Sequence, residues 1–231
     1  MEDLGCPELA PEDARHLGEV RRLRDGESVI ASDGQGGWRA CRAIVARRSV
    51  TLEPEGIISV EAPQVPKIVV GYSLVKGDRT EWAAAKLTEL GTDCIVPLIC
   101  DRTVVRSEDE RGRHRAERLK RIVREAGMQS RLVRLPELAE PRPVAQMSGA
   151  DLSGETCLAD PAGGPLSLAF PVILVGPEGG WSPEELARAE QAGLGSAALG
   201  PHVLRVETAA VVAGGILCAL RANLVSAEPS R

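Results

Sequence analysis

The chain has 231 residues, with 28 Lys and Arg against 33 Asp and Glu, and only five aromatic side chains. A hydrophobic fraction of 43% and a charged fraction of 26% are ordinary for a globular protein, which excludes wholesale disorder and collagen-like repeats. The scarcity of aromatic residues argues against single-stranded nucleic-acid binding on a platform of stacked rings. The net charge of -5 argues against coating of nucleic acid by bulk charge, although a local basic patch would still bind it.

Residues 1–62 are predicted to form a small all-β domain. Strands are expected at 27–32, 38–46 and 49–53. The glycine-rich run 33–37 supplies the positive φ angles of a tight hairpin, and a further turn is expected at 54–56. Pro63 and Pro66 flank the predicted linker to the rest of the chain.

From residue 67 onward, strands and helices are predicted to alternate, which is typical of an α/β domain. Strands are expected at 68–75, 94–99, 171–175 and 197–199, and helices at 80–90, 116–126, 182–193 and 208–223. The apolar run at 171–175 predicts a central parallel strand covered on both faces. Ser182, Pro183 and Glu185 predict a helix start with a capping box. Helices are expected to end at Gly91, Gly127 and Gly193.

Neither a membrane-spanning nor a secretory segment is expected from the residues of this chain. A membrane helix needs roughly 20 apolar residues, and the longest apolar stretch, 209–220, is shorter, so it predicts a buried helix. The amino-terminal residues contain neither a basic nor an apolar stretch, which predicts a cytoplasmic protein. The six cysteines are scattered, without C-x-x-C pairs or histidines at zinc spacing, which predicts reduced thiols and no bound metal.

Positive charge is concentrated in residues 102–134, which hold 11 Lys and Arg against 5 Asp and Glu. A cationic stripe in an acidic protein is typical of contact with a phosphate backbone. The same stripe would also suit a solvated helix face whose cations pair with Glu117 and Glu125. Charge alone favours neither interpretation.

The strongest local signal is the glycine-rich segment 175–182, which lies between the predicted buried strand and the capped helix. Such a turn lies at the carboxyl end of a strand, where open α/β sheets bind ligands. It matches neither the Walker loop nor G-x-G-x-x-G, which argues against phosphate cradling and against a nucleotide-binding oxidoreductase. Backbone recognition of a purine or a short polar chain fits better, and a plain glycine-rich turn is the alternative.

A second strand-to-helix junction reads Leu-Gly-Pro-His-Val-Leu-Arg-Val-Glu-Thr-Ala at 199–209. Together with Gly-Pro-Glu-Gly-Gly at 176–180, it resembles the SPOUT-superfamily methyltransferases of the RsmE type, which methylate N3 of a uridine in small-subunit (16S) ribosomal RNA. The resemblance also includes 14–17, 22–27, 76–82, 86–91 and 118–131, so it covers nearly the whole chain. Met128 stands where the family usually has Glu, His202 stands where Arg is common, and the amino terminus is shorter than usual.

The resemblance implies a PUA-like β-barrel over residues 1–62 that binds RNA. It implies an α/β, SPOUT-type, trefoil-knotted parallel-sheet methyltransferase domain over 67–231. S-adenosylmethionine is the implied cofactor, the small-subunit RNA or the assembled subunit is the implied partner, and the implied active unit is a homodimer. The apolar last helix would then lie in a core or a subunit interface.

The resemblance also implies the binding residues. The implied cofactor loops are 174–180 and 199–204, with 158–161 as a third segment. The implied cofactor-binding residues are Leu174, Gly176, Pro177, Glu178, Gly179, Gly180, Leu199, Gly200, Val203, Leu204, Thr208 and Ala209. The expected RNA-binding residues are Arg15, His16, Arg22, Arg24, Arg113, Arg115, Arg118, Arg121 and Arg124.

Arg205 and Glu207 are the candidate catalytic residues. In the implied reaction the uridine N3 loses its proton, so negative charge develops on the uracil, and a fixed guanidinium such as Arg205 would stabilise it without titrating. Glu207 would orient Arg205 or accept a proton. A carboxylate at a helix N-terminus, paired with Arg205, would equally be structural.

Two other functions fit the same sequence. A knotted methyltransferase acting on another RNA position, such as a ribose 2′-hydroxyl, would carry the same cofactor loops. A catalytically silent RNA-binding or ribosome-assembly protein could keep the fold, although the intact 176–180 loop and Arg205 argue against it.

Overall fold

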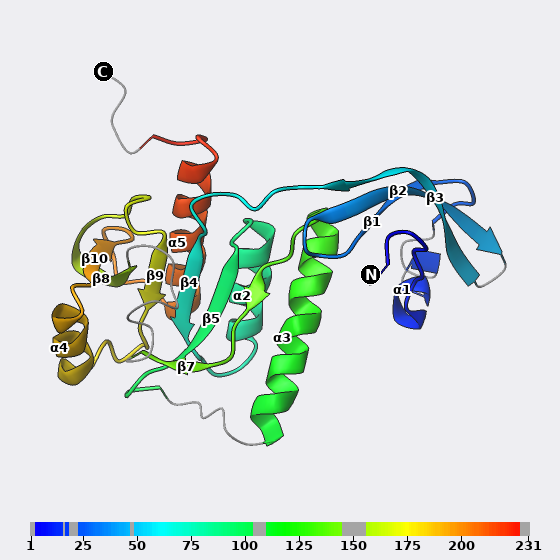
Figure 1. Ribbon diagram of the computed structural model, residues 1–231. Helices are drawn as coiled ribbons and strands as arrows, with labels where there is room; N and C mark the ends of the chain where they lie inside the picture. The colour runs from blue at the N-terminus through cyan, green and yellow to red at the C-terminus, as the bar shows by residue number, and fades with distance from the viewer. Residues whose placement is uncertain are drawn as a thin grey trace. The chain divides into compact units, whose positions relative to one another are not determined.

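The computed structural model describes residues 3–15, 17–18, 23–46, 49–103, 110–144 and 156–226 (Figure 1). The chain divides into two units. The first is Met1–Pro63 together with Arg131–Leu135, and the second is Gln64–Ser130 together with Pro136–Arg231.

The first unit contains a three-stranded antiparallel sheet in the order β1-β2-β3 and the short helix α1 (Pro11–Arg15). The strands are β1 (Ser28–Ser32), β2 (Gly37–Ala46) and β3 (Ser49–Val60). The three expected strands and the glycine hairpin are confirmed. Closure of this sheet into the expected barrel stays a prediction.

The turn expected at 54–56 is wrong, because β3 continues to Val60. Pro54 pairs with Cys41 on β2, and a register shift follows, with Gly56 at φ 70°. Proline and a bulge are tolerated here because β3 is an edge strand, which has no partner on its other side in the sheet order.

The segment 131–135 packs on the β1–β2 hairpin of the first unit, although it follows α3 in the chain. Ser32 Oγ donates to the Val133 carbonyl (2.8 Å), and the Leu135 amide donates to the Gly34 carbonyl (2.8 Å). Arg134 Nη2 donates to the Glu61 carbonyl (2.8 Å). The first unit thus includes chain from well beyond residue 62.

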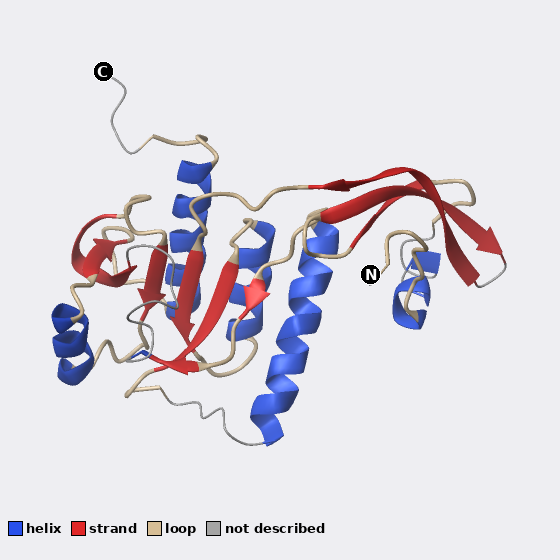
Figure 2. Cartoon of the chain, in the orientation of Figure 1, coloured by secondary structure: helices blue, strands red, loops and turns tan. Residues whose placement is uncertain are grey.

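The second unit contains a parallel sheet in the order β10-β8-β9-β4-β5-β6, with β7 also paired to β5 (Figure 2). Its strands are β4 (Val69–Ser73), β5 (Cys94–Ile99), β6 (Glu137–Leu138), β7 (Arg142–Pro143), β8 (Thr156–Pro165), β9 (Val172–Val175) and β10 (Gly195–Ala198). Its helices are α2 (Arg79–Glu89), α3 (Glu110–Gln129), α4 (Pro183–Gln191) and α5 (Val206–Arg221).

Both faces of this sheet are covered. The helix α2 packs between α3 and α5, and α5 contacts β4 and β9. Ala189 of α4 belongs to the apolar cluster on the other face, which includes Val172 and Leu174 of β9. All four residues of β9 are buried, which confirms the expected central parallel strand.

Several expected boundaries need correction. The helix α3 continues through Gly127 to Gln129, and the left-handed residue after it is Arg131 (φ 58°). The strand β10 ends at Ala198, and α5 begins at Val206 rather than at residue 208. The strand β8 was not expected, because its glycines and prolines are typical of a loop.

Five of the six cysteines are buried, and all six are free thiols. Burial raises the pKa of Cys94 to about 11 and that of Cys100 and Cys157 to about 12, so these thiols are not nucleophiles at neutral pH. Among the helices in the described part of the chain, none combines the length and apolar character needed to cross a bilayer.

Candidate active site

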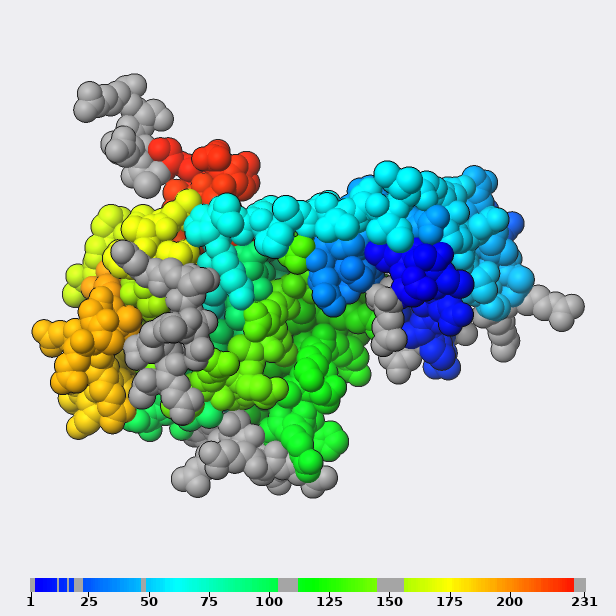
Figure 3. All heavy atoms as spheres, viewed as in Figure 1, coloured from blue at the N-terminus to red at the C-terminus, as the bar shows by residue number. Residues whose placement is uncertain are grey.

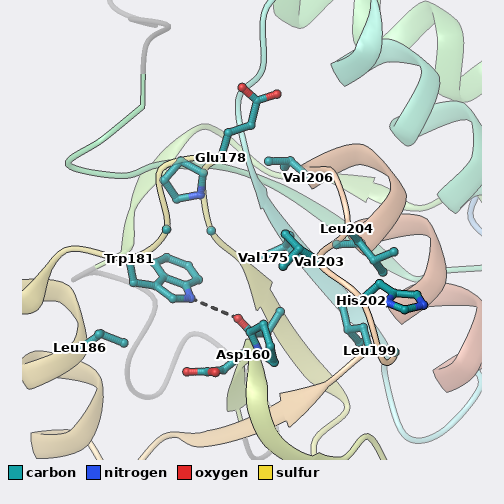
Figure 4. A pocket seen from close by; sticks show the side chains of 17 residues that line it. Asp160, Val175, Glu178, Trp181, Leu186, Leu199, His202, Val203, Leu204 and Val206 are labelled. Carbon is teal, nitrogen blue, oxygen red and sulfur yellow. Dashed lines mark hydrogen bonds between the residues drawn. The ribbon is translucent and has the colours of Figure 1, made fainter.

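A pocket of about 330 Å³ opens in the second unit, where the segments that follow β9 and β10 meet a loop within β8 and the start of α5 (Figure 4). Its volume lies in the range of small-molecule sites. The described lining residues are Ala159, Asp160, Pro161, Val175, Gly176, Pro177, Glu178, Gly180, Trp181, Leu186, Leu199, Gly200, His202, Val203, Leu204, Val206 and Ala209.

The β8 wall exists because β8 pairs with β10 in two separate stretches. Cys157 and Leu158 pair with Gly195 and Ser196, but the next residue of β10, Ala197, pairs with Gly164. Residues 159–163 therefore loop out of the ladder, and 159–161 line the pocket.

The β9 wall requires glycine at 176, because a Cβ on Gly176 would lie 2.8 Å from Cε2 of the Trp181 indole. Trp181 Nε1 donates to the Ala159 carbonyl (3.3 Å), which joins this wall to the β8 loop (Figure 4). Gly180 has a φ of 71°, and its amide donates to the Pro177 carbonyl (2.8 Å). The residues 176–181 thus form a tight turn whose backbone faces the pocket at close range.

Behind the turn, the start of α4 is fixed by a hydrogen-bond network around the buried residues Ser182 and Glu185. Ser182 and Glu185 form the expected capping box, which confirms that prediction. Ser182 Oγ also donates to Asp101 Oδ2 (2.6 Å), and the Asp101 amide donates to Glu185 Oε1 (3.0 Å). Arg102 Nη1 donates to the Gly179 carbonyl (2.7 Å). The loop after β5 therefore holds the turn in place.

Arg79, at the start of α2, connects the turn to α5. Its Nη1 lies 2.7 Å from Glu178 Oε1 and 3.7 Å from Glu207 Oε1. The hydrogen bond to Glu178 raises the pKa of the Arg79 guanidinium. Glu207 is 7% exposed, and its Oε2 has no hydrogen-bond partner among the described residues. Glu207 therefore pairs with Arg79 and not with Arg205.

Arg205 stands in the chain between the lining residues Leu204 and Val206, but it is not itself among the residues that line the pocket. It is the N-cap residue of α5, with extended φ and ψ of -67° and 154°, and its side chain makes no cap hydrogen bond. The side chain is exposed and has no ion-pair partner within the described ranges. The guanidinium is thus accessible from solvent.

Most of the expected cofactor residues line the pocket. They are Gly176, Pro177, Glu178, Gly180, Leu199, Gly200, Val203, Leu204 and Ala209. Leu174, Gly179 and Thr208 do not line it. Leu174 is buried in the core of the sheet, and the Gly179 carbonyl accepts a hydrogen bond from Arg102.

Three lining residues lie outside the expected cofactor loops: Trp181, Leu186 and Val206. Trp181 directly follows the 174–180 loop, Leu186 lies in the first turn of α4, and Val206 begins α5, so their positions beside a loop or at a helix start were the available signal.

The expected RNA-binding arginines of α3 differ in their local pairing. Arg118 Nε lies 3.6 Å from Glu81 Oε1, and Arg121 Nε lies 3.8 Å from Glu125 Oε1. Arg113 is exposed, whereas Arg115 is partly buried, and its Nη1 has no hydrogen-bond partner in the described part of the chain. Arg124 is exposed.

In the first unit, Arg15 and Arg24 are exposed. His16 and Arg22 lie outside the described residues. The structure therefore brings together the cofactor residues, whereas the expected RNA residues are distributed over both units.

Comparison with known proteins agrees with this architecture. Residues 61–218 match the family described as RNA methyltransferase domain, and residues 9–55 match RNA methyltransferase PUA domain. Ribosomal RNA small subunit methyltransferase E of Mycobacterium bovis is 33% identical over 218 residues, which cover 87% of this chain and 81% of that protein. The Bacillus subtilis protein of the same name is 27% identical over 231 residues, 89% of this chain and 86% of that protein.

Solved structures give the same result. Ribosomal RNA small subunit methyltransferase E from Neisseria gonorrhoeae, bound to S-adenosyl methionine, matches with a TM-score of 0.78 and 29% identity over 92% of this chain and 90% of that chain. A Legionella pneumophila methyltransferase with the bound cofactor SAM matches with a TM-score of 0.80 and 30% identity over 91% and 90%. The expected parallel-sheet α/β methyltransferase fold and the PUA-like domain are confirmed, and the trefoil knot stays a prediction. The chain belongs to the RNA methyltransferase family that includes ribosomal RNA small subunit methyltransferase E.

Proposed function

We propose that this protein transfers a methyl group from S-adenosylmethionine to N3 of a uridine in the 16S RNA of the small ribosomal subunit. The observation that carries the proposal is the glycine-walled pocket, with the exposed Arg205 next in the chain to two of its lining residues. The named relatives act on small-subunit ribosomal RNA, and the RNA substrate is extended to this chain from them. Ribosomal subunits are in the cytoplasm, which is the location we propose.

The pocket suits S-adenosylmethionine in size and in chemistry. The close turn 176–181 and Gly200 offer backbone donors and acceptors for the purine and the polar chain. Apolar walls from Val175, Leu199 and Leu204 suit the rings. When bound, the cofactor supplies an electrophilic methyl carbon attached to a cationic sulfur.

The chain's own residues then have three tasks. The pocket walls orient the reacting groups, and positioning of this kind supplies a large part of methyl-transfer catalysis. Arg205 stabilises the negative charge that develops on the uracil as the N3 proton leaves. The ion pairs of Arg79 with Glu178 and Glu207 hold the turn and the start of α5 in register, so Glu207 acts as a support for Arg205's helix rather than as a proton acceptor.

We also propose that the active unit is a homodimer that forms through α5. One face of this helix is only half-buried although it is apolar: Val211, Val212, Gly215, Ile216, Ala219 and Leu220. The apolar surface continues past the helix end, where Leu224 and Val225 are exposed, and Figure 3 shows this segment at the surface in red. A second copy of the chain would cover this face by a self-complementary, two-fold interface.

The test is methyl transfer from labelled S-adenosylmethionine to unmodified small subunits, with nucleoside mass spectrometry of the RNA. We expect N3-methyluridine. A ribose-methylated product would reassign the target, and failure to bind the cofactor would support the silent RNA-binding alternative.

The Arg205→Ala variant separates binding from chemistry. We expect a loss of transfer of about 10²-fold, typical of a removed charge-stabilising group, with cofactor affinity unchanged. Arg188→Ala is the matched control, because Arg188 is an exposed arginine on α4 outside the pocket lining. An equal loss of binding and transfer in Arg205→Ala would instead make Arg205 part of the pocket wall.

A further inference from the structure

The walls of the pocket carry negative charge. Asp160 and Glu178 line it, and the described lining residues include no Lys or Arg. In Figure 4 the two carboxylates lie at different places, with Glu178 at the top of the view and Asp160 below Trp181. A charged wall matters here because two ions interact more strongly in a protein pocket than in bulk water.

The two carboxylates differ in their partners. Glu178 Oε1 forms an ion pair with Arg79 Nη1 at 2.7 Å, so the Arg79 cation offsets its charge. Asp160 Oδ1 accepts the amide N–H of Ala162 at 2.8 Å, and Asp160 forms no ion pair within the described chain. Asp160 is only partly exposed, and it lies on the loop that leaves the β8 ladder. Its charge is therefore the uncompensated one in the pocket.

We propose that Asp160 makes the pocket selective for the cationic cofactor over its spent form. This inference rests on the proposed binding of S-adenosylmethionine. Loss of the methyl group converts a sulfonium into a neutral thioether, so S-adenosylhomocysteine carries one positive charge less. The Asp160 carboxylate attracts the sulfonium and loses that attraction after transfer, which favours exchange of the product for a new cofactor molecule.

The size of the effect follows from Coulomb's law. A cavity of this volume is roughly 8 Å across, and two unit charges at that separation in an effective dielectric of about 30 change an affinity about tenfold. The selectivity between the two cofactor forms should change by about this factor when the Asp160 charge is removed.

The experiment is calorimetric binding of three ligands to the full chain and to Asp160→Asn. The ligands are S-adenosylmethionine, S-adenosylhomocysteine and sinefungin, in which an amine-bearing carbon replaces the methylated sulfur. We expect Asp160→Asn to weaken the two cationic ligands about tenfold and to leave S-adenosylhomocysteine within about twofold. Retained binding of S-adenosylhomocysteine also shows that the variant is folded.

Two control variants sharpen the result. Asp160→Glu keeps the negative charge. It should keep the preference for S-adenosylmethionine over S-adenosylhomocysteine, even if the affinities for both fall. Glu190→Gln removes an exposed charge of α4 outside the pocket lining. It should leave the ratio of the affinities for S-adenosylmethionine and S-adenosylhomocysteine unchanged. Equal weakening of all three ligands by Asp160→Asn, or no weakening, would overturn the inference. If the unaltered chain binds none of them, the proposed function itself fails.

Discussion

The pocket and the basic face of α3 are built in opposite ways. The pocket walls are largely backbone and apolar side chains, and a buried network around Ser182 and a tight turn hold them. The α3 face consists of exposed charged side chains, several of which pair with neighbours three or four residues away. Folding alone therefore fixes the shape of the pocket, whereas the charge that α3 offers to RNA depends on which cations are already paired.

In a comparison of these two regions, the largest effect is expected in the backbone wall of the pocket. In Gly176→Ala the new methyl group would lie 2.8 Å from the Trp181 indole, so the ring must move and lose its contact with the β8 loop. We expect the affinity for S-adenosylmethionine to fall at least 30-fold, measured by calorimetry, with RNA binding unchanged. Gly164→Ala is the control, because a Cβ there meets open space. Unchanged cofactor affinity in Gly176→Ala would contradict the prediction that this wall is rigid.

A second comparison concerns stability. Ser182→Ala removes the cap of α4 and the hydrogen bond to Asp101, so we expect the free energy of unfolding to fall by about 1–2 kcal/mol. Lys120→Ala removes an exposed ion pair with Glu117 on α3, and we expect a much smaller change, because solvent screens exposed pairs. Urea denaturation followed by circular dichroism measures both. Equal losses would show that the exposed pairs contribute as much as the buried network.

The smallest effect separates two arginines on α3. Arg113 is exposed without an ion-pair partner among the described residues, whereas Arg121 pairs with Glu125 at 3.8 Å. We expect Arg113→Ala to weaken binding of small-subunit RNA about fivefold. The slope of log affinity against log salt concentration should fall by about one, because one phosphate contact is lost. Arg121→Ala should cost about twofold. Fluorescence anisotropy across a salt series measures the RNA affinity of each variant. Equal losses would mean that ion pairs within α3 do not determine which arginines contact RNA.

The same contrast explains what the sequence could predict. Glycine, proline and capping residues act on their own neighbours, so the turn 176–180 and the start of α4 could be placed from local signals. The ion pair of Arg79 with Glu178 joins residues about a hundred positions apart, and no local pattern indicates it. Arg205 and Glu207 look like a pair in the sequence, yet the fold brings Arg79 to Glu207 instead.

The fold was predictable where a strand is a continuous apolar run, as in β5 and β9, or where a helix has a clear apolar period, as in α2. It was not predictable where packing overrides composition. The strand β8 contains Pro161, Gly163 and Gly164, which are poor strand formers, and it forms because β9 and β10 pair with it on either side. The loop that bears Asp160 is a result of that imperfect pairing.

The return of 131–135 to the first unit has a consequence for how this protein is made and cut. A ribosome completes β3 at Val60. The segment 131–135, which packs on the β1–β2 hairpin, is synthesised only after α2, β5 and α3. The amino-terminal unit therefore cannot finish folding before part of the second unit has emerged. A gene divided at the linker near Pro63 would separate Arg134 from the Glu61 carbonyl that it binds, so the two units are better expressed as one chain.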